Sequence, residues 1–320
     1  MYTIGVDLGG TNIAIGLVNE KFEIVKKGSV PTKPERGADP IIADMAKLSR
    51  QLMEELGITM DEIAFIGVAT PGTANNVTGV VEYANNIPFL QYPLAANLSA
   101  LMDGKPVYIE NDANAAAKAE AMAGVAAGAP ISVMITLGTG LGGGIVIDGK
   151  VYSGFNFAGG ELGHTVIERG GRQCSCGRKG CWEAYSSATG LVNITKDRVL
   201  EARAAGRKTS IDDMIGNDLS RVSARTAFAA MKAGDELAAE IVDEYISYLA
   251  CGISNTINLF HPNVLSIGGG VCNEGDYLLR PLFDKVWAHT YSREGEPRCE
   301  IKIAKLGNDA GIIGAAVLGK

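Results

Sequence analysis

Short apolar runs separated by glycine and polar turns organise the start of the chain. TIGVDLGGTNIAIGLV predicts a strand, a glycine turn and a second strand, and EIVKKGSV predicts a third strand after the polar turn NEKF. Apolar residues then recur at helical spacing over residues 39–56, so we expect a helix that ends at Gly57. The pattern therefore predicts three strands followed by a helix.

Strands and helices alternate in the next part of the chain. IAFIGVAT predicts a buried strand before the turn TPG, and residues 94–103 predict a short helix. KPVYIEND predicts a strand that stops at Asn111–Asp112, and the alanine-rich ANAAAKAEAMAG predicts a helix directly after it. This order is typical of an α/β protein in which some strands are antiparallel.

The opening pattern then occurs a second time. ISVMITLGTGLGGGIVIDGKVY again predicts strand, glycine turn, strand and turn, which indicates an internal duplication of one supersecondary unit. Two similar domains facing each other across a cleft would follow from it. Residues 222–260 are expected to be helical, with His261 ending that helix before Pro262, and NVLSIGGGV predicts a further strand. The terminal GNDAGIIGAAVLGK predicts a helix that could pack on the sheet of either domain.

Composition narrows the class of protein. A length of 320 residues suggests two domains of about 150 residues each. The chain is 47% apolar and 20% charged, which indicates well-buried cores, and its apolar runs are too short to predict a transmembrane span. Met1 leads directly into a strand, and the six cysteines suit a reducing cytoplasm, so we expect a cytoplasmic protein. A net charge of −7 argues against a nucleic-acid partner.

The segment GGELGHTVIERGGRQCSCGRKGCWE carries the strongest chemical signal. Its imidazole and three thiols form a complete ligand set for tetrahedral Zn²⁺, which prefers sulfur and nitrogen donors. A disulfide or a coincidental cluster is the alternative, but two of the cysteines lie too close together to pair comfortably. We therefore expect a structural zinc whose ligands are His164, Cys174, Cys176 and Cys181.

Two carboxylates bracket this metal segment. A zinc that holds His164 would also determine where Glu161 and Glu183 point, which is one way to build a rigid polar pocket for a hydroxyl-rich molecule. The alternative is that the charges are solvated surface groups. That alternative suits Glu168 and Arg169 better than Glu161, which lies inside GGELGH.

The two glycine hairpins suggest phosphate binding. Backbone N–H groups without neighbouring Cβ atoms can approach phosphate oxygens closely, and Thr11 and Thr139 could add hydroxyl donors. Asp7, at the end of the first strand, could hold a Mg²⁺-bound water. Neither hairpin is a Walker A motif or a dinucleotide fingerprint, and one hairpin alone would be an ordinary turn. Two matched hairpins, with GGG at 268–270, favour a nucleotide.

Asn111 and Asp112 stand where a strand ends and a helix begins. Asn and Asp are both preferred helix N-caps, so a capping role is the simple interpretation. The same position also suits a general base, because the polarity of a helix N-terminus keeps a carboxylate ionised. Spacing alone leaves both interpretations open.

Taken together, these motifs resemble the ROK sugar kinases of the actin-like ATPase superfamily. The similarity covers essentially the whole chain, through VDLGGTN, TPG, NNIP, END, LGTGLGGGI, GGELGH and CSCGRKGCWE. It implies an α/β fold of two actin-like (ribonuclease H-like) domains with mixed sheets around a central cleft. It also implies a smaller N-terminal domain at 1–116 plus 307–320, where the C-terminal helix returns, and a larger domain at 117–306 that carries the zinc loop.

The resemblance also implies roles for individual residues. Asp112 matches the general base that accepts the proton of the sugar hydroxyl. Matches to sugar-binding positions are Gly72, Asn86, Asn111, Asp112, Glu161, His164 and Glu183. Matches to the phosphate and Mg²⁺ region are Asp7, Gly9, Gly10, Thr11, Asn12, Gly138, Thr139 and Gly140, and matches to the loop near the adenosine are Gly269 and Gly270.

The activity implied by the resemblance is ATP-dependent phosphorylation of a hexose, with Mg²⁺ and a structural Zn²⁺. Glucose is the expected substrate; the alternatives in the family are N-acetylhexosamine, fructose or allose kinases, and sugar-responsive repressors. A repressor fits less well, since the first strand begins at Tyr2 and we expect no DNA-binding module before it. We expect a homodimer or homotetramer, without a nucleic-acid or membrane partner.

Overall fold

The computed structural model describes residues 1–320 and divides into two compact units. The first unit contains Met1–Met134, Gly144–Gly160 and Ala304–Lys320, and the second contains Ile135–Gly143 and Glu161–Ile303. None of the helices combines the length and the apolar composition needed to cross a membrane.

The first unit is built on a five-stranded mixed sheet in the order β3-β2-β1-β4-β8. The central strand β1 pairs antiparallel with β2 and parallel with β4. The strands are β1 (Tyr2–Leu8), β2 (Asn12–Val18), β3 (Ile24–Pro31), β4 (Ile63–Thr70) and β8 (Val107–Asn111). Each lies where the apolar pattern predicts a strand.

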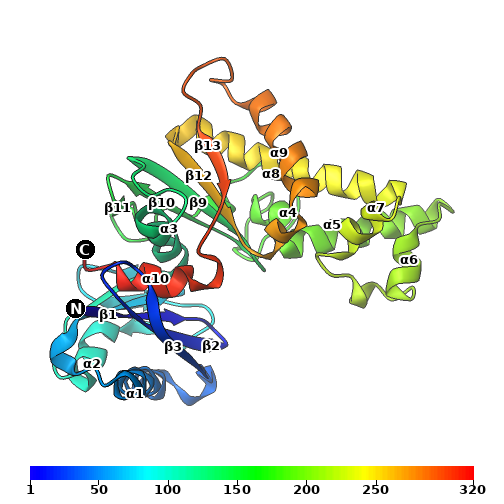
Figure 1. Ribbon diagram of the computed structural model, residues 1–320. Coiled ribbons are helices and arrows are strands. Elements are labelled where there is room, and N and C mark those ends of the chain that lie inside the picture. Colours follow the sequence, from blue (N-terminus) through cyan, green and yellow to red (C-terminus); the bar gives the residue numbers. More distant parts are fainter. The chain divides into compact units, whose positions relative to one another are not determined.

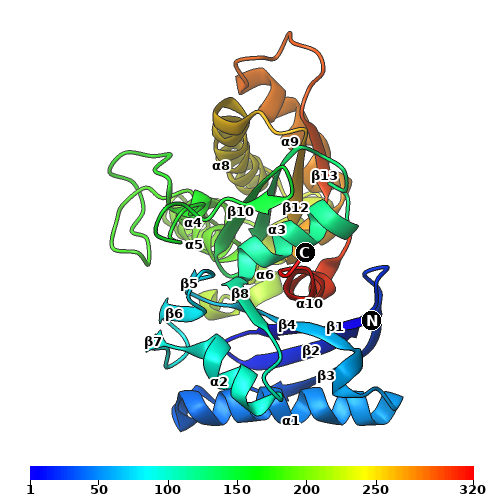
Figure 2. The ribbon, with the colours of Figure 1, turned by 90° about the vertical axis from the view of Figure 1, so that its left-hand side faces the viewer.

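Helices cover both faces of this sheet (Figures 1 and 2). α1 (Ala38–Leu56) and α2 (Leu94–Leu101) lie on one face. α3 (Asp112–Ala123) and α10 (Ala310–Ala316) lie on the other, so the C-terminal helix packs on the N-terminal sheet. α1 ends at Gly57, as its sequence pattern predicts. The expected domain boundaries after residues 116 and 306 remain a prediction.

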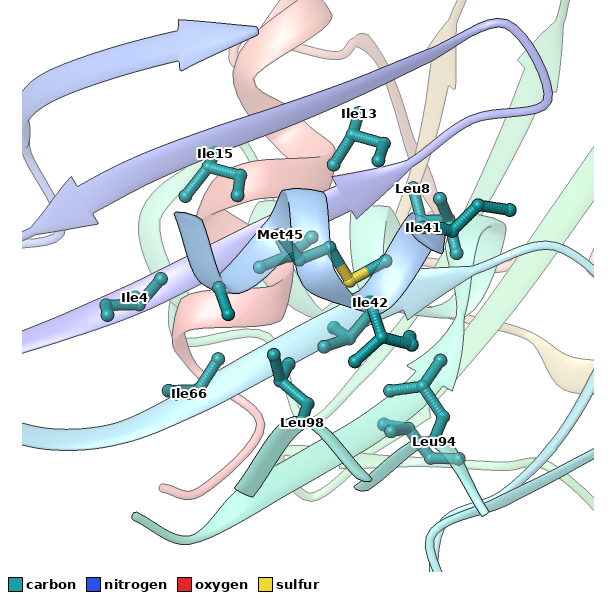
Figure 3. Close-up of a cluster of buried hydrophobic side chains, with 14 of the residues drawn as sticks. Ile4, Leu8, Ile13, Ile15, Ile41, Ile42, Met45, Ile66, Leu94 and Leu98 are labelled. Atoms are coloured by element: carbon teal, nitrogen blue, oxygen red, sulfur yellow. The ribbon is translucent and has the colours of Figure 1, made fainter. Parts of the chain in front are cut away.

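The approach of α10 to the sheet depends on glycine. A Cβ on Gly5 or Gly67 would clash with the backbone of Ile312 or Ala315 in α10. On the opposite face, Figure 3 shows side chains of α1 and α2 meeting those of the strands. The labelled side chains of this cluster are fully buried: Ile4, Leu8, Ile13, Ile15, Ile41, Ile42, Met45, Ile66, Leu94 and Leu98. Each contributes about 1.5–3 kcal/mol by leaving water.

A small antiparallel sheet extends from the first unit, in the order β5-β6-β7. Its strands are β5 (Thr73–Asn75), β6 (Val80–Tyr83) and β7 (Leu90–Tyr92). The sequence pattern does not reveal these short strands, although it marks the turn TPG before β5.

A second five-stranded sheet has the order β11-β10-β9-β12-β13. Its strands are β9 (Ile131–Leu137), β10 (Leu141–Ile147), β11 (Lys150–Val151), β12 (Val264–Gly268) and β13 (Glu300–Ile303). In both sheets, the first three strands along the chain lie in the order third, second, first, and the fourth and fifth strands follow on the side of the first. The shared topology confirms the duplication inferred from the two glycine hairpins.

The second unit is rich in helices. They are α4 (Glu183–Ser186), α5 (Ala188–Ala204), α6 (Ser210–Ile215), α7 (Thr226–Lys232), α8 (Glu236–Phe260) and α9 (Asp276–His289). The helical pattern expected over residues 222–260 is divided between α7 and α8, because Gly234 has φ +92° and Asp235 caps a new helix by accepting the Ala238 N–H. α8 ends at His261, as expected.

Short 3₁₀ helices complete the chain. They are Pro34–Arg36, Met60–Glu62, Leu162–His164, Leu219–Arg221, Gly270–Glu274 and Gly307–Asp309. Leu162–His164 carries the histidine of the expected metal site, and Gly270–Glu274 directly follows β12.

Candidate active site

The first glycine hairpin, Gly9–Asn12, joins β1 to β2. It closes with a hydrogen bond from the Gly9 N–H to the Asn12 carbonyl oxygen at 2.9 Å. Thr32, a fully buried residue that is not part of the hairpin, forms two hydrogen bonds with it. Its hydroxyl donates to the Gly9 carbonyl at 2.7 Å, and its N–H donates to the Thr11 carbonyl at 2.8 Å. Two carbonyls of the hairpin are therefore held by one residue.

Asp7 lies at the end of β1, one residue before Leu8. Desolvation, and then the charge of Asp112, raises the pKa of the Asp7 carboxyl to about 6. A Cβ on Gly311 would clash with this carboxyl group, so glycine is required where α10 begins. A carboxylate oxygen at this position is a hard donor of the kind that Mg²⁺ prefers.

Asn111 and Asp112 divide the two roles that the sequence leaves open. Asn111 is the N-cap of α3: its Oδ1 accepts the N–H groups of Ala113 at 3.0 Å and Asn114 at 3.3 Å. Asp112 is the first residue of the helix and is exposed. Desolvation by the surrounding protein nevertheless raises the pKa of its carboxyl, against the hydrogen bond from the Ala113 N–H. Because Asn111 supplies the cap, the Asp112 carboxylate is not needed as the helix cap.

The buried carboxylate of Glu110 organises this strand end. It accepts the Asn76 amide at 2.8 Å, the Asn114 amide at 3.1 Å and the Asn111 N–H at 2.9 Å. The Asn111 amide in turn donates to the Gly72 carbonyl at 3.1 Å. These bonds tie the turn before β5 and the loop after it to the start of α3.

The loop that carries Asn86 lies against the first hairpin. A Cβ on Gly10 would stand 3.3 Å from the Asn86 Cβ. The first unit therefore gathers one set of the expected site residues: Asp7, Gly9, Gly10, Thr11, Asn12, Gly72, Asn86, Asn111 and Asp112.

The second hairpin, Gly138–Gly140, joins β9 to β10. Its Gly138 N–H donates to the Gly140 carbonyl at 3.0 Å. The first turn of α5 holds it: the Ala188 N–H donates to the Gly138 carbonyl at 2.9 Å, and the Thr189 hydroxyl donates to the Thr139 carbonyl at 2.7 Å. Gly269, with φ +100°, packs against the backbone of Leu137 just before this hairpin, and Gly270 follows it.

Glu183 connects the second hairpin to the cysteine segment. Its Oε2 accepts the Leu141 N–H at 2.9 Å, and its Oε1 accepts the Ser175 hydroxyl at 3.2 Å. A Cβ on Gly140 would clash with the Glu183 carboxylate. The carboxylate therefore occupies the space that a side chain at residue 140 would take.

The histidine and the three cysteines expected to bind zinc come together in space. Their ligand atoms all lie within 4.8 Å of one another. His164 Nδ1 lies 3.6 Å from Cys174 Sγ, and Cys176 Sγ lies 3.6 Å from Cys181 Sγ. These separations are too long for a disulfide, and they suit four ligands that surround one Zn²⁺ at about 2.0–2.3 Å. The donor set therefore fits zinc.

A pocket of about 530 Å³ opens beside this cluster within the second unit. The residues that line it include Thr139, Gly140, Ser175, Glu183, Thr189 and Asn193. Glu161 precedes the 3₁₀ helix Leu162–His164, and its carbonyl accepts the His164 N–H at 3.1 Å. This hydrogen bond ties the backbone of Glu161 to that of His164.

Several residues that shape the site carry no signal in the sequence. Thr32 and Thr189 are single threonines far from the hairpins they hold, and Glu110 looks like a strand residue before the polar pair. Ser175 lies between two cysteines, where a small linker residue is the simple interpretation. In each case the function depends on a contact that only the fold creates.

Known proteins resemble this chain along its whole length. The ROK family model matches residues 3–320. A glucokinase of Halalkalibacterium halodurans is 36% identical over 318 residues, which cover 99% of this chain and 94% of that protein. An N-acetyl-D-glucosamine kinase of Aliivibrio salmonicida is 33% identical over 329 residues, a match that covers 98% of this chain and 98% of that protein. The crystal structure of a Streptomyces griseus ROK glucokinase in complex with glucose and AMPPNP has a TM-score of 0.79, at 32% identity and 99% coverage of each chain.

These similarities confirm the expected fold class, an α/β chain with two actin-like domains. With a match that extends from the third residue to the last, the chain belongs to the ROK family.

Proposed function

We propose that this protein is an ATP-dependent hexose kinase that transfers a phosphoryl group to glucose, with Asp112 as the general base. The observation that carries the proposal is the division of roles at the start of α3. Asn111 caps the helix, which leaves the exposed Asp112 carboxylate available to a substrate hydroxyl. The similarity to glucokinases, one of them seen with glucose and AMPPNP, supports the same activity.

Phosphoryl transfer needs positioning and charge neutralisation more than covalent chemistry, because its transition state is loose. Asp112 would orient the sugar hydroxyl and accept its proton late in the reaction. The raised pKa of its carboxyl suits this task, because a general base works best when its pKa lies near the working pH. The N–H groups of the two hairpins would bind the phosphate oxygens of ATP.

Both metals have a place in this proposal. Mg²⁺, when bound with the nucleotide, neutralises charge on the phosphate oxygens, and Asp7 would hold it or its water. Zn²⁺ would be held by His164 and the three cysteines, away from the reacting atoms. Its effect would be structural, since the loop it fixes also carries Ser175, which donates to Glu183.

The sugar hydroxyls would be bound by Asn111, Glu161, His164 and Glu183. N-acetylglucosamine is the second candidate substrate, because a kinase for that sugar is also similar over the full chain. The two sugars differ by one acetamido group at a single carbon, a difference that a few pocket residues can discriminate. Glucose is proposed because the glucokinase relative is more similar, at 36% against 33% identity.

A coupled ADP-release assay with MgATP tests the proposal. The sugars are glucose, N-acetylglucosamine, N-acetylmannosamine, mannose, fructose and allose, and the protein is first shown to hold zinc. Highest kcat/KM on glucose supports the proposal, and highest kcat/KM on N-acetylglucosamine replaces the substrate but keeps the reaction. No turnover on any of the six sugars contradicts it. We place the reaction in the cytoplasm and expect a homodimer or homotetramer, which sedimentation would test.

A further inference from the structure

The two hairpins are held from outside in the same manner. At the first, Thr32 donates its hydroxyl to the Gly9 carbonyl and its N–H to the Thr11 carbonyl. At the second, Thr189 donates its hydroxyl to the Thr139 carbonyl. The N–H that completes this second pair comes from the neighbouring Ala188. In each unit, one threonine hydroxyl and one backbone N–H hold two carbonyls of a three- or four-residue turn.

Holding a carbonyl determines the direction of the next N–H. The peptide unit is planar and trans, so its C=O and N–H bonds point to opposite sides. A Gly9 carbonyl turned toward Thr32 therefore turns the Gly10 N–H away from Thr32. By the same geometry, a Thr139 carbonyl turned toward Thr189 turns the Gly140 N–H the other way. We call each threonine together with the carbonyl that it holds, Thr32 with Gly9 and Thr189 with Thr139, a clamp. Each clamp thus presents a hairpin N–H group on the side opposite the threonine.

We propose that Thr32 and Thr189 are positioning residues that aim the N–H groups of the two hairpins at the phosphates of the nucleotide. This inference rests on the proposed kinase function, because it takes the hairpins to be the phosphate site. Neither threonine needs to touch the nucleotide. Each acts through the carbonyl that it holds.

The anchoring of each threonine supports this role. The Thr32 carbonyl accepts the Arg36 guanidinium at 3.2 Å, and Arg36 forms an ion pair with Asp44 of α1 at 2.6 Å. Thr189 lies in the first turn of α5, which the Ser187 hydroxyl caps by accepting the Gly190 N–H at 3.0 Å. Both clamps are therefore fixed to a long helix of their own unit.

The two clamps differ in their exposure to water. Thr32 is fully buried and its bond to the Gly9 carbonyl is partly buried, so removing its hydroxyl leaves that carbonyl with less access to a replacement water. Thr189 is exposed, so water can replace its hydroxyl on the Thr139 carbonyl. We therefore expect a larger effect at Thr32 than at Thr189.

The test measures the affinity of the whole protein for MgADP and MgAMPPNP by calorimetry. It also measures the KM for MgATP and the KM for glucose. Thr32→Val removes the hydroxyl at nearly constant volume and should weaken nucleotide binding about tenfold, with the KM for glucose within about twofold of the wild type. Thr32→Ser keeps the hydroxyl and should restore the affinity. Thr189→Val should weaken nucleotide binding about threefold.

Thr290→Val is the matched control. Thr290 is also fully buried, and its hydroxyl donates to a backbone carbonyl, that of Val286, at 2.8 Å. It lies at the end of α9, outside both hairpins, so this variant should lose some stability and keep its nucleotide affinity. A purely structural role for Thr32 would make Thr32→Val behave in the same way.

The outcomes separate this inference from the proposed function. Unchanged nucleotide affinity in folded Thr32→Val overturns the inference, and so does a failure of Thr32→Ser to restore it. If Thr32→Val does not fold, the test falls on Thr189→Val, whose residue is exposed. Unchanged nucleotide affinity in that variant overturns the inference. A wild-type protein that binds MgADP but phosphorylates no hexose contradicts the proposed function while the clamps can still be tested. A wild-type protein that binds no nucleotide contradicts both.

Discussion

The two glycine hairpins share a topology but are supported by different means. Each follows the first strand of a five-stranded sheet with the same strand order, and each has two carbonyls held from outside. The first is held by one buried residue, Thr32, and follows the strand end that carries Asp7, whose carboxyl is influenced by the charge of Asp112. The second is more exposed and is joined through Glu183 to the cysteine cluster. The duplicated backbone is thus retained while the supporting chemistry has diverged.

This difference separates two requirements of the proposed reaction. Near the first hairpin, desolvation raises the pKa of the Asp7 and Asp112 carboxyls, and the charge of Asp112 raises the pKa of Asp7 further. A raised pKa makes the Asp112 carboxylate a stronger base, which suits proton transfer. Near the second, the histidine–cysteine cluster and the start of α5 adjoin a pocket whose lining includes Ser175, Glu183 and Asn193, side chains that can bind hydroxyl groups. Perturbing one region should therefore change a different property from perturbing the other.

The largest effect is expected from Asp112→Asn, which tests the proton-transfer role of the first region. Turnover should fall about 10³-fold, because the amide cannot accept the proton, while glucose and zinc still bind. The measurements are kcat, glucose affinity by calorimetry and zinc content. Asp103→Asn, which changes an exposed carboxylate paired with Arg50, is the control and should keep full activity. An active Asp112→Asn enzyme would remove Asp112 from the mechanism.

The second largest effect is expected from Cys176→Ala, which tests the metal support of the second region. Loss of one ligand should weaken sugar binding on the order of 10- to 100-fold and lower the melting temperature, because the loop that carries Ser175 loosens. The affinity for MgADP should change much less if the first hairpin contributes independently. Cys251→Ala, a thiol of α8 outside the cluster, is the control. Normal glucose affinity in a metal-free Cys176→Ala protein would contradict the structural role of zinc.

The sequence predicts those parts of the fold and site whose partners are close along the chain. The strands β1 and β2 and the helix α1 follow from their apolar periodicity, and the four metal-type ligands lie within one short segment, so spacing suffices. The sequence analysis makes no prediction for α9, which contains Pro281, a residue that usually interrupts a helical pattern.

Contacts across the fold could not be predicted in this way. Thr32 holds a carbonyl 23 residues away, and Thr189 holds one 50 residues away. A single threonine has no preferred partner at such a separation. The same limit applies to Glu110, whose bond to Asn76 spans 34 residues. Hydrogen bonds of this kind depend on tertiary packing, which periodicity does not encode.

The third prediction uses the raised pKa of Asp7 at the first hairpin. The folded protein holds this proton up to a pH of about 6, whereas the unfolded chain releases it near 3.8, so this carboxyl makes the folded state less stable as pH rises through that interval. Asp7→Asn should therefore increase the free energy of unfolding at pH 7.5 by about 2 kcal/mol, and by less at pH 5. Urea unfolding at both pH values measures the difference. An equal change at the two pH values would contradict the pKa explanation.

The smallest effect is expected from Gly140→Ala, which probes the link between the second hairpin and Glu183. The added Cβ would clash with the Glu183 carboxylate and displace it from the Leu141 N–H, so the KM for glucose should rise about tenfold. Gly138→Ala is the matched control, since the nearest atom to a Cβ at that residue is 3.9 Å away. Both variants add a methyl group to the same hairpin, and only the one at residue 140 meets the Glu183 carboxylate. If both raise the KM for glucose equally, the flexibility of the hairpin and not the position of Glu183 limits sugar binding.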